Sequence, residues 1–540
     1  MIEQQHHPAW FDPGPIAREG AVVPAILQRW SRERPGALCV RFDDGSQWTY
    51  DEAWNISRTV AGGLQRLGVA RGDIVLVWLP NGPSLMRAWF GLNALGAVYT
   101  PMNVALRGGM LEHVIRNSGA TTLIVHHELV ARLESLDISG LRQVVVCGGK
   151  DVALSKNVAL LPEVELTQGP PAAELPDLEP GDIAAVLYTS GTTGLSKGVL
   201  VPYAQLAVAG QAAHGYLRAN DRIYIFTPLF HTVGMSGVYA TLNKGACFHL
   251  AESFHARTFW QDIKDAGCNR ILGLISSMTS YLAKTSPEGE ACPFDFAMMS
   301  PITADTAAFA KARGFDYFAA YSMTEVSVPI ISAVNSTVFG SCGRPRSGIE
   351  CRVVDAADNE VAPGEIGELA LRSDLPWTMN AGYLNDDAAT AHAWRNGWFH
   401  TGDAFRQDAD GNFYFVDRLK DAIRRRGENV SSIEVELEIA AFPGVMEVAV
   451  VGVPSGHGDD EVLAIVAAAA GTEIDPADLI SFLVERLPHF AVPRFVRTLG
   501  SLPKTPTGKI KKHELREEGL AAEIWDREAH GIHIRRRELS

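Results

Sequence analysis

The chain has 540 residues but only seven cysteines, and none of them stands in the pairs that metal and redox motifs need. They are scattered singly between Cys39 and Cys351, without any C-x-x-C. An odd number of dispersed cysteines argues against a disulfide framework and against a thiolate zinc site. The H-E-x-x-H motif of zinc proteases is also absent.

Long hydrophobic runs are missing too. The longest aliphatic run, VLAIVAAAA from residue 462, has about half of the roughly 20 residues that a membrane-spanning helix needs. The N-terminal stretch MIEQQHHPAWFDPGP lacks the apolar region of a secretory signal. We therefore expect no membrane insertion and a cytoplasmic location.

Basic residues are outnumbered, with 48 Lys and Arg against 63 Asp and Glu, for a net charge of -15. This balance argues against a general nucleic-acid binder. Hydrophobic residues make up 46% and charged residues 21%, as in ordinary globular proteins. The length exceeds what one core usually holds, so we expect two or more domains.

Short apolar runs alternate with helical patterns over the first part of the chain. Residues 73–80, 121–127, 143–149 and 183–190 read as buried strands, and residues 84–98 read as a helix between two of them. This alternation predicts an α/β fold with largely parallel sheets.

The pattern changes near residue 417, where a charged stretch contains three consecutive arginines. Two strand-like runs and a helical run follow, at residues 447–455, 460–469 and 476–488. They predict a small α+β domain, and the boundary is placed between Leu419 and Lys420, giving domains 1–419 and 420–540. The charged tail beyond Leu520 predicts a helix or a loose end.

The stretch LYTSGTTGLSKGVL, residues 187–200, has the composition of a phosphate-binding loop that follows a strand and precedes a helical stretch. Glycines let the backbone N–H groups approach phosphate oxygens, and the Ser and Thr hydroxyls add donors. The common Walker A loop requires G-K-[ST], but Lys197 is followed by Gly198 and Val199. The loop therefore serves a different nucleotide reaction.

This loop resembles the phosphate loop of the adenylate-forming superfamily, which includes acyl-CoA synthetases, peptide-synthetase adenylation domains and luciferases. Further motifs of that family follow in the same order, namely YSMTE (321–325), GRPRSGIE (343–350), GEIGELALRS (364–373), WFHTGD (398–403), YFVDRLKDAI (414–423) and LPKTPTGKI (502–510). The resemblance implies a large N-terminal domain of α/β subdomains and a small, mobile α+β C-terminal domain.

The resemblance also implies an ATP-dependent carboxylic acid:CoA ligase that uses ATP and Mg²⁺, with CoA as a substrate. The acid forms an acyl-adenylate and releases pyrophosphate, and a thiol then displaces AMP. An enzyme that loads a carrier protein is the alternative, and a binding protein without chemistry is a third. No carrier-like segment follows Lys509.

The residues that match the family's ATP site fall into three groups. The phosphate loop contributes Thr189, Ser190, Gly191, Thr192, Thr193, Gly194 and Lys197, and Thr189 and Glu325 match the Mg²⁺ positions. Tyr321 is expected to flank the adenine and Thr324 to contact the α-phosphate, while Ser322 replaces a common glycine. Asp403 and Arg418 match the ribose contacts.

The C-terminal domain is expected to supply residues for both half-reactions. Lys509 matches the catalytic lysine that bridges the carboxylate and the α-phosphate, and Lys420 matches the hinge. After rotation of the domain, Gly427 and Glu428 are expected to line the access path of the CoA thiol. The arginines at 424–426 are suited to the CoA phosphates.

The expected acyl pocket departs from the common pattern. Where many relatives have G-G-A-P, this chain has FAMMSPITADT at 296–306. Because it lacks G-G-A-P but carries YFVDR (414–418) and RRGENVSS (425–432), the chain resembles the branch of carnitine/crotonobetaine-type CoA ligases. The expected pocket residues are His231 as a gate, with Val233, Gly234, Met235, Met278, Met299 and Val328 as walls. None of these wall residues is acidic, so we expect an apolar acid of moderate size. The sequence leaves a homodimer open.

Overall fold

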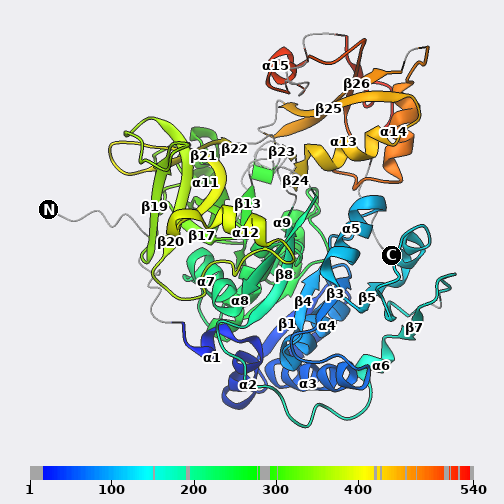
Figure 1. The fold of residues 1–540 in the computed structure, drawn as a ribbon. Helices are drawn as coiled ribbons and strands as arrows, with labels where there is room; N and C mark the ends of the chain where they lie inside the picture. Colours follow the sequence, from blue (N-terminus) through cyan, green and yellow to red (C-terminus); the bar gives the residue numbers. More distant parts are fainter. Residues whose placement is uncertain are drawn as a thin grey trace.

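A computed structural model describes residues 16–149, 152–189, 195–275, 278–279, 282, 292–300, 302–418, 422–425, 428–455, 459–469, 471–503, 510, 512–520 and 523–534. Its elements form a large body that runs up to strand β22 and a smaller C-terminal part that begins with strand β23 (Figure 1). Among these residues, no helix has both the length and the hydropathy to cross a lipid bilayer.

The largest sheet has seven strands in the order β7-β6-β5-β3-β4-β8-β9. In that order they span Ala159–Pro162, Gln143–Cys147, Thr122–His126, Ile74–Trp78, Val98–Pro101, Ile183–Thr189 and Lys197–Pro202. Only β9 runs antiparallel to its neighbour. The four apolar runs that predicted buried strands all lie in this sheet, which confirms that prediction.

The same part of the chain also forms helices, two of which pack together very closely. They are α1 (Arg18–Ala21), α2 (Val23–Glu33), α3 (Tyr50–Arg66), α4 (Pro83–Leu95), α5 (Gly108–Ser118), η1 (His127–Leu133) and α6 (Val164–Thr167). A Cβ at Gly91 of α4 would lie only 2.3 Å from Val60 of α3. Helix α4 ends earlier than predicted, because Gly96 takes a left-handed φ of 72° and stops it before β4.

A second sheet has the order β12-β10-β11-β1-β2. These strands span Arg270–Ile271, Arg222–Ile225, Cys247–Leu250, Leu38–Phe42 and Gln47–Thr49, and the accompanying helices are α7 (Tyr203–His214), α8 (Thr232–Lys244) and α9 (Phe259–Asp265). Helices α7 and α8 touch at Gly210, where a Cβ would lie 2.8 Å from the Ser236 carbonyl oxygen. Only glycine permits this approach.

The phosphate loop lies between two antiparallel strands, so the expectation that a helix follows it directly is wrong. Strand β8 ends at Thr189, β9 begins at Lys197, and α7 starts only at Tyr203. The sequence of β9 explains the difference, because Val199 and Val201 are both buried and β-branched residues favour strands.

Three smaller sheets complete the body. They comprise β13 (Gly273–Ile275), β14 (Phe296–Ser300) and β15 (Asp316–Phe318); β16 (Ala320–Met323), β17 (Ser327–Ile331) and β18 (Arg344–Pro345); and β19 (Ile349–Val354), β20 (Ile366–Ser373), β21 (Phe399–Gln407) and β22 (Phe413–Arg418). The helices beside them are α11 (Ala304–Arg313), α12 (Asp387–Ala393) and η2 (Arg395–Gly397).

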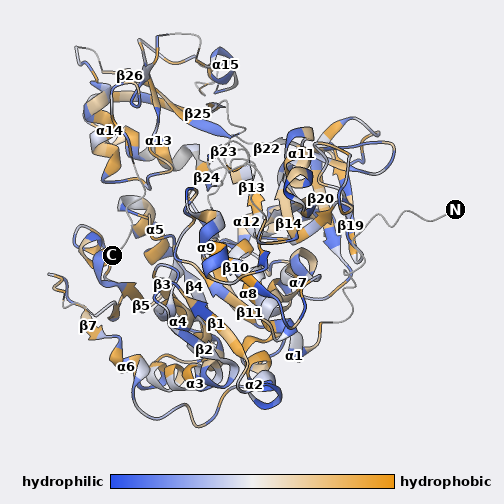
Figure 2. Ribbon diagram, turned by 180° about the vertical axis from the view of Figure 1, so that it is seen from behind, coloured by the Kyte–Doolittle hydropathy of each residue, from blue (hydrophilic) through white to orange (hydrophobic). Residues whose placement is uncertain are grey.

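The C-terminal part has hydrophobic cores of its own, and Figure 2 shows hydrophobic residues around β26 and α14. Its elements are β23 (Ala422–Arg425), β24 (Glu428–Ser431), α13 (Ser432–Ala440), β25 (Val445–Pro454), β26 (Asp460–Ala468), α14 (Pro476–Val484), β27 (Phe495–Leu499), α15 (Lys512–Glu518) and β28 (Trp525–Asp526). The predicted strands and helix are therefore present. The boundary at 419/420 lies outside the described residues.

The tail beyond residue 520 is neither a helix nor a loose end over residues 523–534. Strand β28 pairs antiparallel with β27, joining Phe495 to Asp526 and Val496 to Trp525. The Trp525 ring packs against the C-terminal core, and Arg527 is only 1% exposed. These two side chains anchor a stretch whose charge suggested solvent exposure.

Candidate active site

The two ends of the phosphate loop face each other across the β8–β9 pair. Thr189 and Lys197 are Cα partners in that register. Helix α5 holds both ends, because a ring nitrogen of His113 lies 2.8 Å from the Ser196 carbonyl oxygen and the Tyr188 hydroxyl donates to Asn117 at 2.7 Å. Residues 190–194, which include the predicted Ser190, Gly191, Thr192, Thr193 and Gly194, lie outside the described residues.

Tyr383 joins two of the predicted residues, Lys197 and Glu325, although the sequence analysis missed it. The Lys197 Nζ lies 4.9 Å from the centre of the Tyr383 ring, and the Tyr383 hydroxyl donates to Glu325 Oε1 at 3.1 Å. Its segment runs along β9, with hydrogen bonds from Leu200 N to Gly382 O and from Leu384 N to Gly198 O. This pairing places an aromatic ring between the lysine and the carboxylate.

Thr324 and Glu325 form the turn between β16 and β17. Gln205 of α7 holds the turn with two hydrogen bonds. Its side-chain amide donates to the Thr324 carbonyl at 2.7 Å, and its backbone carbonyl accepts from Ser327 Oγ at 3.1 Å. Ser327 takes a left-handed φ of 62°. The adjoining Ser322 is exposed. Helix α7 therefore sets the position of the predicted α-phosphate contact.

Tyr321 and Asp403, the expected adenine and ribose contacts, meet directly. The Tyr321 hydroxyl donates to Asp403 Oδ2 at 2.7 Å, and Asp403 is 3% exposed. Arg418 is the Cα partner of Asp403 across β21 and β22. The edge of the Tyr321 ring contacts Phe405, with ring centres 4.9 Å apart. Strands β16 and β21 thus meet at the Tyr321–Asp403 hydrogen bond, and β22 pairs with β21 at Asp403.

One carboxylate and one hydroxyl fit the Mg²⁺ site that the sequence predicts. Glu325 is 5% exposed, and Thr189 ends the strand beside Lys197. Mg²⁺ in nucleotide sites typically takes one or two protein oxygens and completes its shell with phosphate oxygens and water. Within the described residues, no group of three or more His, Cys, Asp or Glu forms a metal site. The donor set suits a metal that arrives with ATP.

His231 contacts the C-terminal part through Glu428. Its Nε2 lies 3.1 Å from Glu428 Oε2, although the two residues are 197 positions apart. Burial disfavours the charged imidazole, but the carboxylate of Glu428 attracts its proton more strongly, so the pKa of His231 is raised. A histidine at the expected acyl gate is thereby tied to a residue expected near the thiol path.

The other predicted pocket residues do not form one surface. Val233 and Gly234 lie in the first turn of α8, and Met235 beside them is fully buried. Met278 and Met299 belong to one hydrophobic cluster, with Met299 fully buried. Val328 belongs to another, together with Met298, Phe296, Phe318 and Tyr216. Alternation along β14 turns Met298 toward Val328 and Met299 away from it.

Several expected C-terminal residues lie outside the described residues, namely Lys420, Gly427 and Lys509, as does Arg426. The two neighbouring arginines differ. Arg424 is exposed, whereas Arg425 is 1% exposed with its Nε 2.7 Å from Glu461 Oε2. Arg425 is therefore a buried structural residue, and the expectation that it meets a CoA phosphate is wrong.

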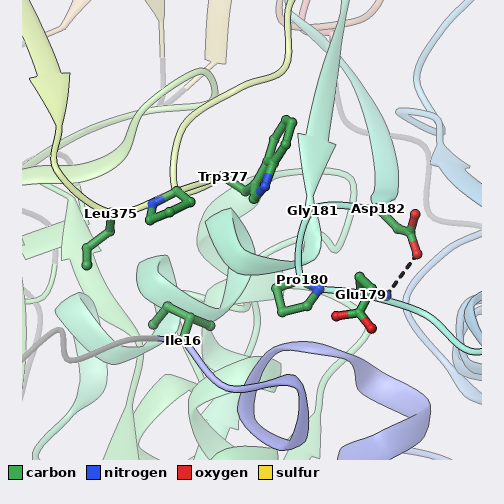
Figure 3. A pocket seen from close by; sticks show the side chains of 8 residues that line it. Ile16, Glu179, Pro180, Gly181, Asp182, Leu375 and Trp377 are labelled. Atoms are coloured by element: carbon green, nitrogen blue, oxygen red, sulfur yellow. Dashed lines mark hydrogen bonds between the residues drawn. The ribbon is translucent and has the colours of Figure 1, made fainter.

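A cavity of about 570 Å³ lies away from these residues. It is lined by Ile16, Glu179, Pro180, Gly181, Asp182, Leu375, Pro376 and Trp377 (Figure 3). The Trp377 indole covers Gly181, where a Cβ would lie 2.9 Å from the ring. None of the predicted site residues lines this cavity.

Comparison with known proteins identifies two matching family models. The model described as AMP-binding enzyme matches residues 27–384, and the model described as AMP-binding enzyme C-terminal domain matches residues 434–509.

Two curated relatives cover most of the chain. Feruloyl-CoA synthase from an Amycolatopsis species is 32% identical over 502 residues, covering 90% of this chain and 97% of that protein. Crotonobetaine/carnitine–CoA ligase from Salmonella arizonae is 30% identical over 462 residues, covering 83% and 89%. In a solved structure, o-succinylbenzoate CoA synthetase from Bacillus subtilis has the same fold, with a TM-score of 0.79 at 22% identity over 92% of this chain and 98% of that one.

Proposed function

We propose that this chain, which belongs to the family of AMP-binding enzymes, makes the CoA thioester of an apolar aromatic carboxylic acid. It is an AMP-forming acyl-CoA synthetase of the adenylate-forming superfamily, and it uses ATP, Mg²⁺ and CoA. Transfer to a carrier protein is not favoured, because its curated relatives are CoA ligases.

The reaction has two half-reactions with balanced leaving groups. A carboxylate oxygen attacks the α-phosphate of ATP, forming the acyl-adenylate and releasing pyrophosphate. The sulfur of CoA then attacks the acyl carbon, losing its proton and releasing AMP. Carboxylate is a poor electrophile at neutral pH, so the AMP leaving group makes the second step feasible. Positioning and charge balance are the main tasks of such a site.

The buried cluster around Glu325 suits the first half-reaction. Lys197 supplies positive charge for the phosphates, and Tyr383 holds both its ammonium and the Glu325 carboxylate. Bound Mg²⁺ would neutralise phosphate charge between Thr189 and Glu325. Tyr321 and Asp403 are the proposed adenosine contacts, and Lys509 is the proposed catalytic lysine.

The aromatic substrate class is supported above all by the hydrophobic cluster behind the Thr324–Glu325 turn. It joins Val328 of β17 and Met298 of β14 to the rings of Tyr216, Phe296 and Phe318. His214 beside it is uncharged, because burial lowers its pKa to about 3. Apolar and aromatic side chains with a deformable methionine are better suited to a planar aromatic acid than to a quaternary ammonium group.

A competition experiment tests this function. The protein would be incubated with ATP, Mg²⁺, CoA and an equimolar mixture of ferulate, benzoate, hexanoate and carnitine, and the thioesters would be counted by mass spectrometry. We expect an aromatic acyl-CoA and stoichiometric AMP. Omission of ATP and a Glu325→Gln variant serve as controls. Carnitinyl-CoA as the main product would contradict the substrate class, and acyl-adenylate without thioester would contradict CoA as the acceptor.

A further inference from the structure

The hairpin of β23 and β24 is the place where the C-terminal part reaches the acyl-site histidine. The two strands lie where the C-terminal part meets the body (Figure 1). Arg425 and Glu428 are Cα partners in the hairpin, and Glu428 contacts His231 at 3.1 Å. Whatever fixes Arg425 therefore also fixes the strand that carries Glu428.

Arg425 is held inside the C-terminal part by a buried ion pair and by two backbone carbonyls. Its Nε lies 2.7 Å from Glu461 Oε2, with side chains only 1% and 5% exposed. Its Nη1 donates to the carbonyls of Phe490 and Val492 at 3.0 and 2.9 Å. The hairpin is thus attached to β26 and to the segment that leads into β27.

The C-terminal tail also binds the segment that leads into β27. Arg494 donates from Nε and Nη2 to both carboxylate oxygens of Asp526 at 3.2 and 3.0 Å, and its Nη1 lies 4.0 Å from Glu461 Oε1. Arg527, which is buried, donates to the Pro493 carbonyl at 3.0 Å. A two-pronged arginine–carboxylate pair fixes geometry as well as charge.

These contacts form one continuous path from β28 to His231. It runs from Asp526 through Arg494 and Glu461 to Arg425, and then across the hairpin to Glu428. The tail that begins the path lies beyond both matched family models, which end at residues 384 and 509. We propose that Arg494 and Asp526 are positioning residues that hold the β23–β24 hairpin for the thioester-forming half-reaction.

This inference rests on the proposed function and on the expectation that Gly427 and Glu428 line the access path of the CoA thiol. It predicts that loosening the tail slows transfer to CoA and leaves adenylate formation intact. Thr189, Lys197, Glu325 and Asp403 lie in the body, and Lys509, the proposed catalytic lysine of that step, is not one of the residues on the path. Displacement of a reacting group by about 1 Å can cost up to roughly 100-fold in rate.

The test separates the two half-reactions in the full-length protein. Asp526→Asn removes one charge at constant size, and Asp526→Glu is the conservative variant. Pyrophosphate release from ATP and ferulate reports the first half, and feruloyl-CoA formation from supplied feruloyl-adenylate and CoA reports the second. We expect Asp526→Asn to slow the second half roughly 10- to 100-fold, with the first half within about twofold and activity restored in Asp526→Glu.

Glu518→Gln is the matched control, because it breaks the Arg497–Glu518 surface pair of the same part, which is not on the path. We expect Glu518→Gln to change the rate of neither half-reaction. Arg494→Lys keeps the charge but loses the two-pronged contact, so it should reproduce the Asp526→Asn effect.

Equal loss of both halves, or no loss in either, would overturn the inference. If the wild type made no thioester from any acid of the panel, the proposed function would fail instead, so the two failures are distinguishable.

Discussion

Tyr383 shows at the scale of a single residue how separate motifs become one site. Its ring carries the Lys197 ammonium and its hydroxyl binds Glu325, so one side chain relates the phosphate loop to the proposed Mg²⁺ carboxylate. Tyr383 and Glu325 are 8% and 5% exposed. In such surroundings a hydrogen bond to a charged group is stronger than in water.

Tyr383→Phe removes the hydroxyl and keeps the ring. A hydrogen bond to a charged group contributes about 1.5–3 kcal/mol, so we expect kcat/KM for ATP to fall roughly 10- to 100-fold. The rate of pyrophosphate release at varied ATP and Mg²⁺ concentrations measures this kcat/KM. Tyr99→Phe is the control, since Tyr99 is fully buried and its hydroxyl has no partner among the described residues. An unchanged kcat/KM in Tyr383→Phe would show that the hydroxyl does not orient Glu325.

The His231–Glu428 pair makes a second prediction, because two opposing effects act on the histidine. Burial favours the neutral ring, and Glu428 favours the charged ring and prevails. Since the folded pKa lies above the unfolded value of about 6.5, the pair stabilises the folded protein fully below that pH. The stabilisation is lost as the pH rises through the raised pKa.

Glu428→Gln removes the carboxylate that favours the charged ring, so the pKa of His231 should fall. Titration of labelled histidine ring signals by NMR measures this shift. His214 is an internal reference, because burial lowers its pKa to about 3 in both proteins. A His231 titration that did not change would refute the contact.

At the scale of elements, the α7–α8 contact supports the turn that holds Thr324 and Glu325. Gly210 lets the two helices touch, with a would-be Cβ 2.8 Å from Ser236 O and 2.9 Å from Ala240 N. One and a half turns earlier, Gln205 of α7 holds the Thr324 carbonyl. A displacement of α7 would therefore also displace the Thr324–Glu325 turn.

Gly210→Val should push α7 from α8. Overpacking of this kind costs about 1–3 kcal/mol, and we expect a lower urea midpoint together with a reduced rate of pyrophosphate release. Gly36→Ala provides the control, since a Cβ there meets nothing within 4 Å. Equal urea midpoints for the two variants would mean that the contact is not tight.

Much of this fold could be predicted from the sequence, because buried parallel strands are continuous apolar runs. The runs at 73–80, 121–127, 143–149 and 183–190 were of this kind. Strand β9 was missed because its six residues, Lys197–Pro202, are too few to show a clear period after the glycine-rich loop. The tail was misjudged because its charges pair internally, as Arg494 does with Asp526.

Only the site residues that lie in family motifs could be predicted from the sequence. Lys197, Glu325, Tyr321 and Asp403 follow from family patterns. In the structure Tyr383 links Lys197 to Glu325, and Tyr321 binds Asp403. Tyr383 lies in none of the motifs used. Met298 and Met299 lie in different hydrophobic clusters, and Arg425 is buried in an ion pair with Glu461. Neither arrangement follows from residue type alone.

At the scale of the whole molecule, the C-terminal part rests on the N-terminal end of α5. Met110 of α5 joins the C-terminal core. A Cβ at Gly109 would lie 2.8 Å from Glu438 Oε1, and the pKa of Glu438 is raised by burial although the Gly109 N–H opposes the shift. This contact and the His231–Glu428 pair define one orientation of the two parts. The proposed mechanism requires a second orientation, in which Lys509 reaches the acid and ATP.

The most direct test of the account is a single-turnover comparison of both half-reactions in Lys509→Ala and Gly427→Trp. We predict that Lys509→Ala abolishes acyl-adenylate formation but makes the thioester from supplied acyl-adenylate. Gly427→Trp should do the reverse, because an indole would block the thiol path while the ATP site stays open. If both variants lost both half-reactions equally, the assignment of one face of the C-terminal domain to each half-reaction would be contradicted.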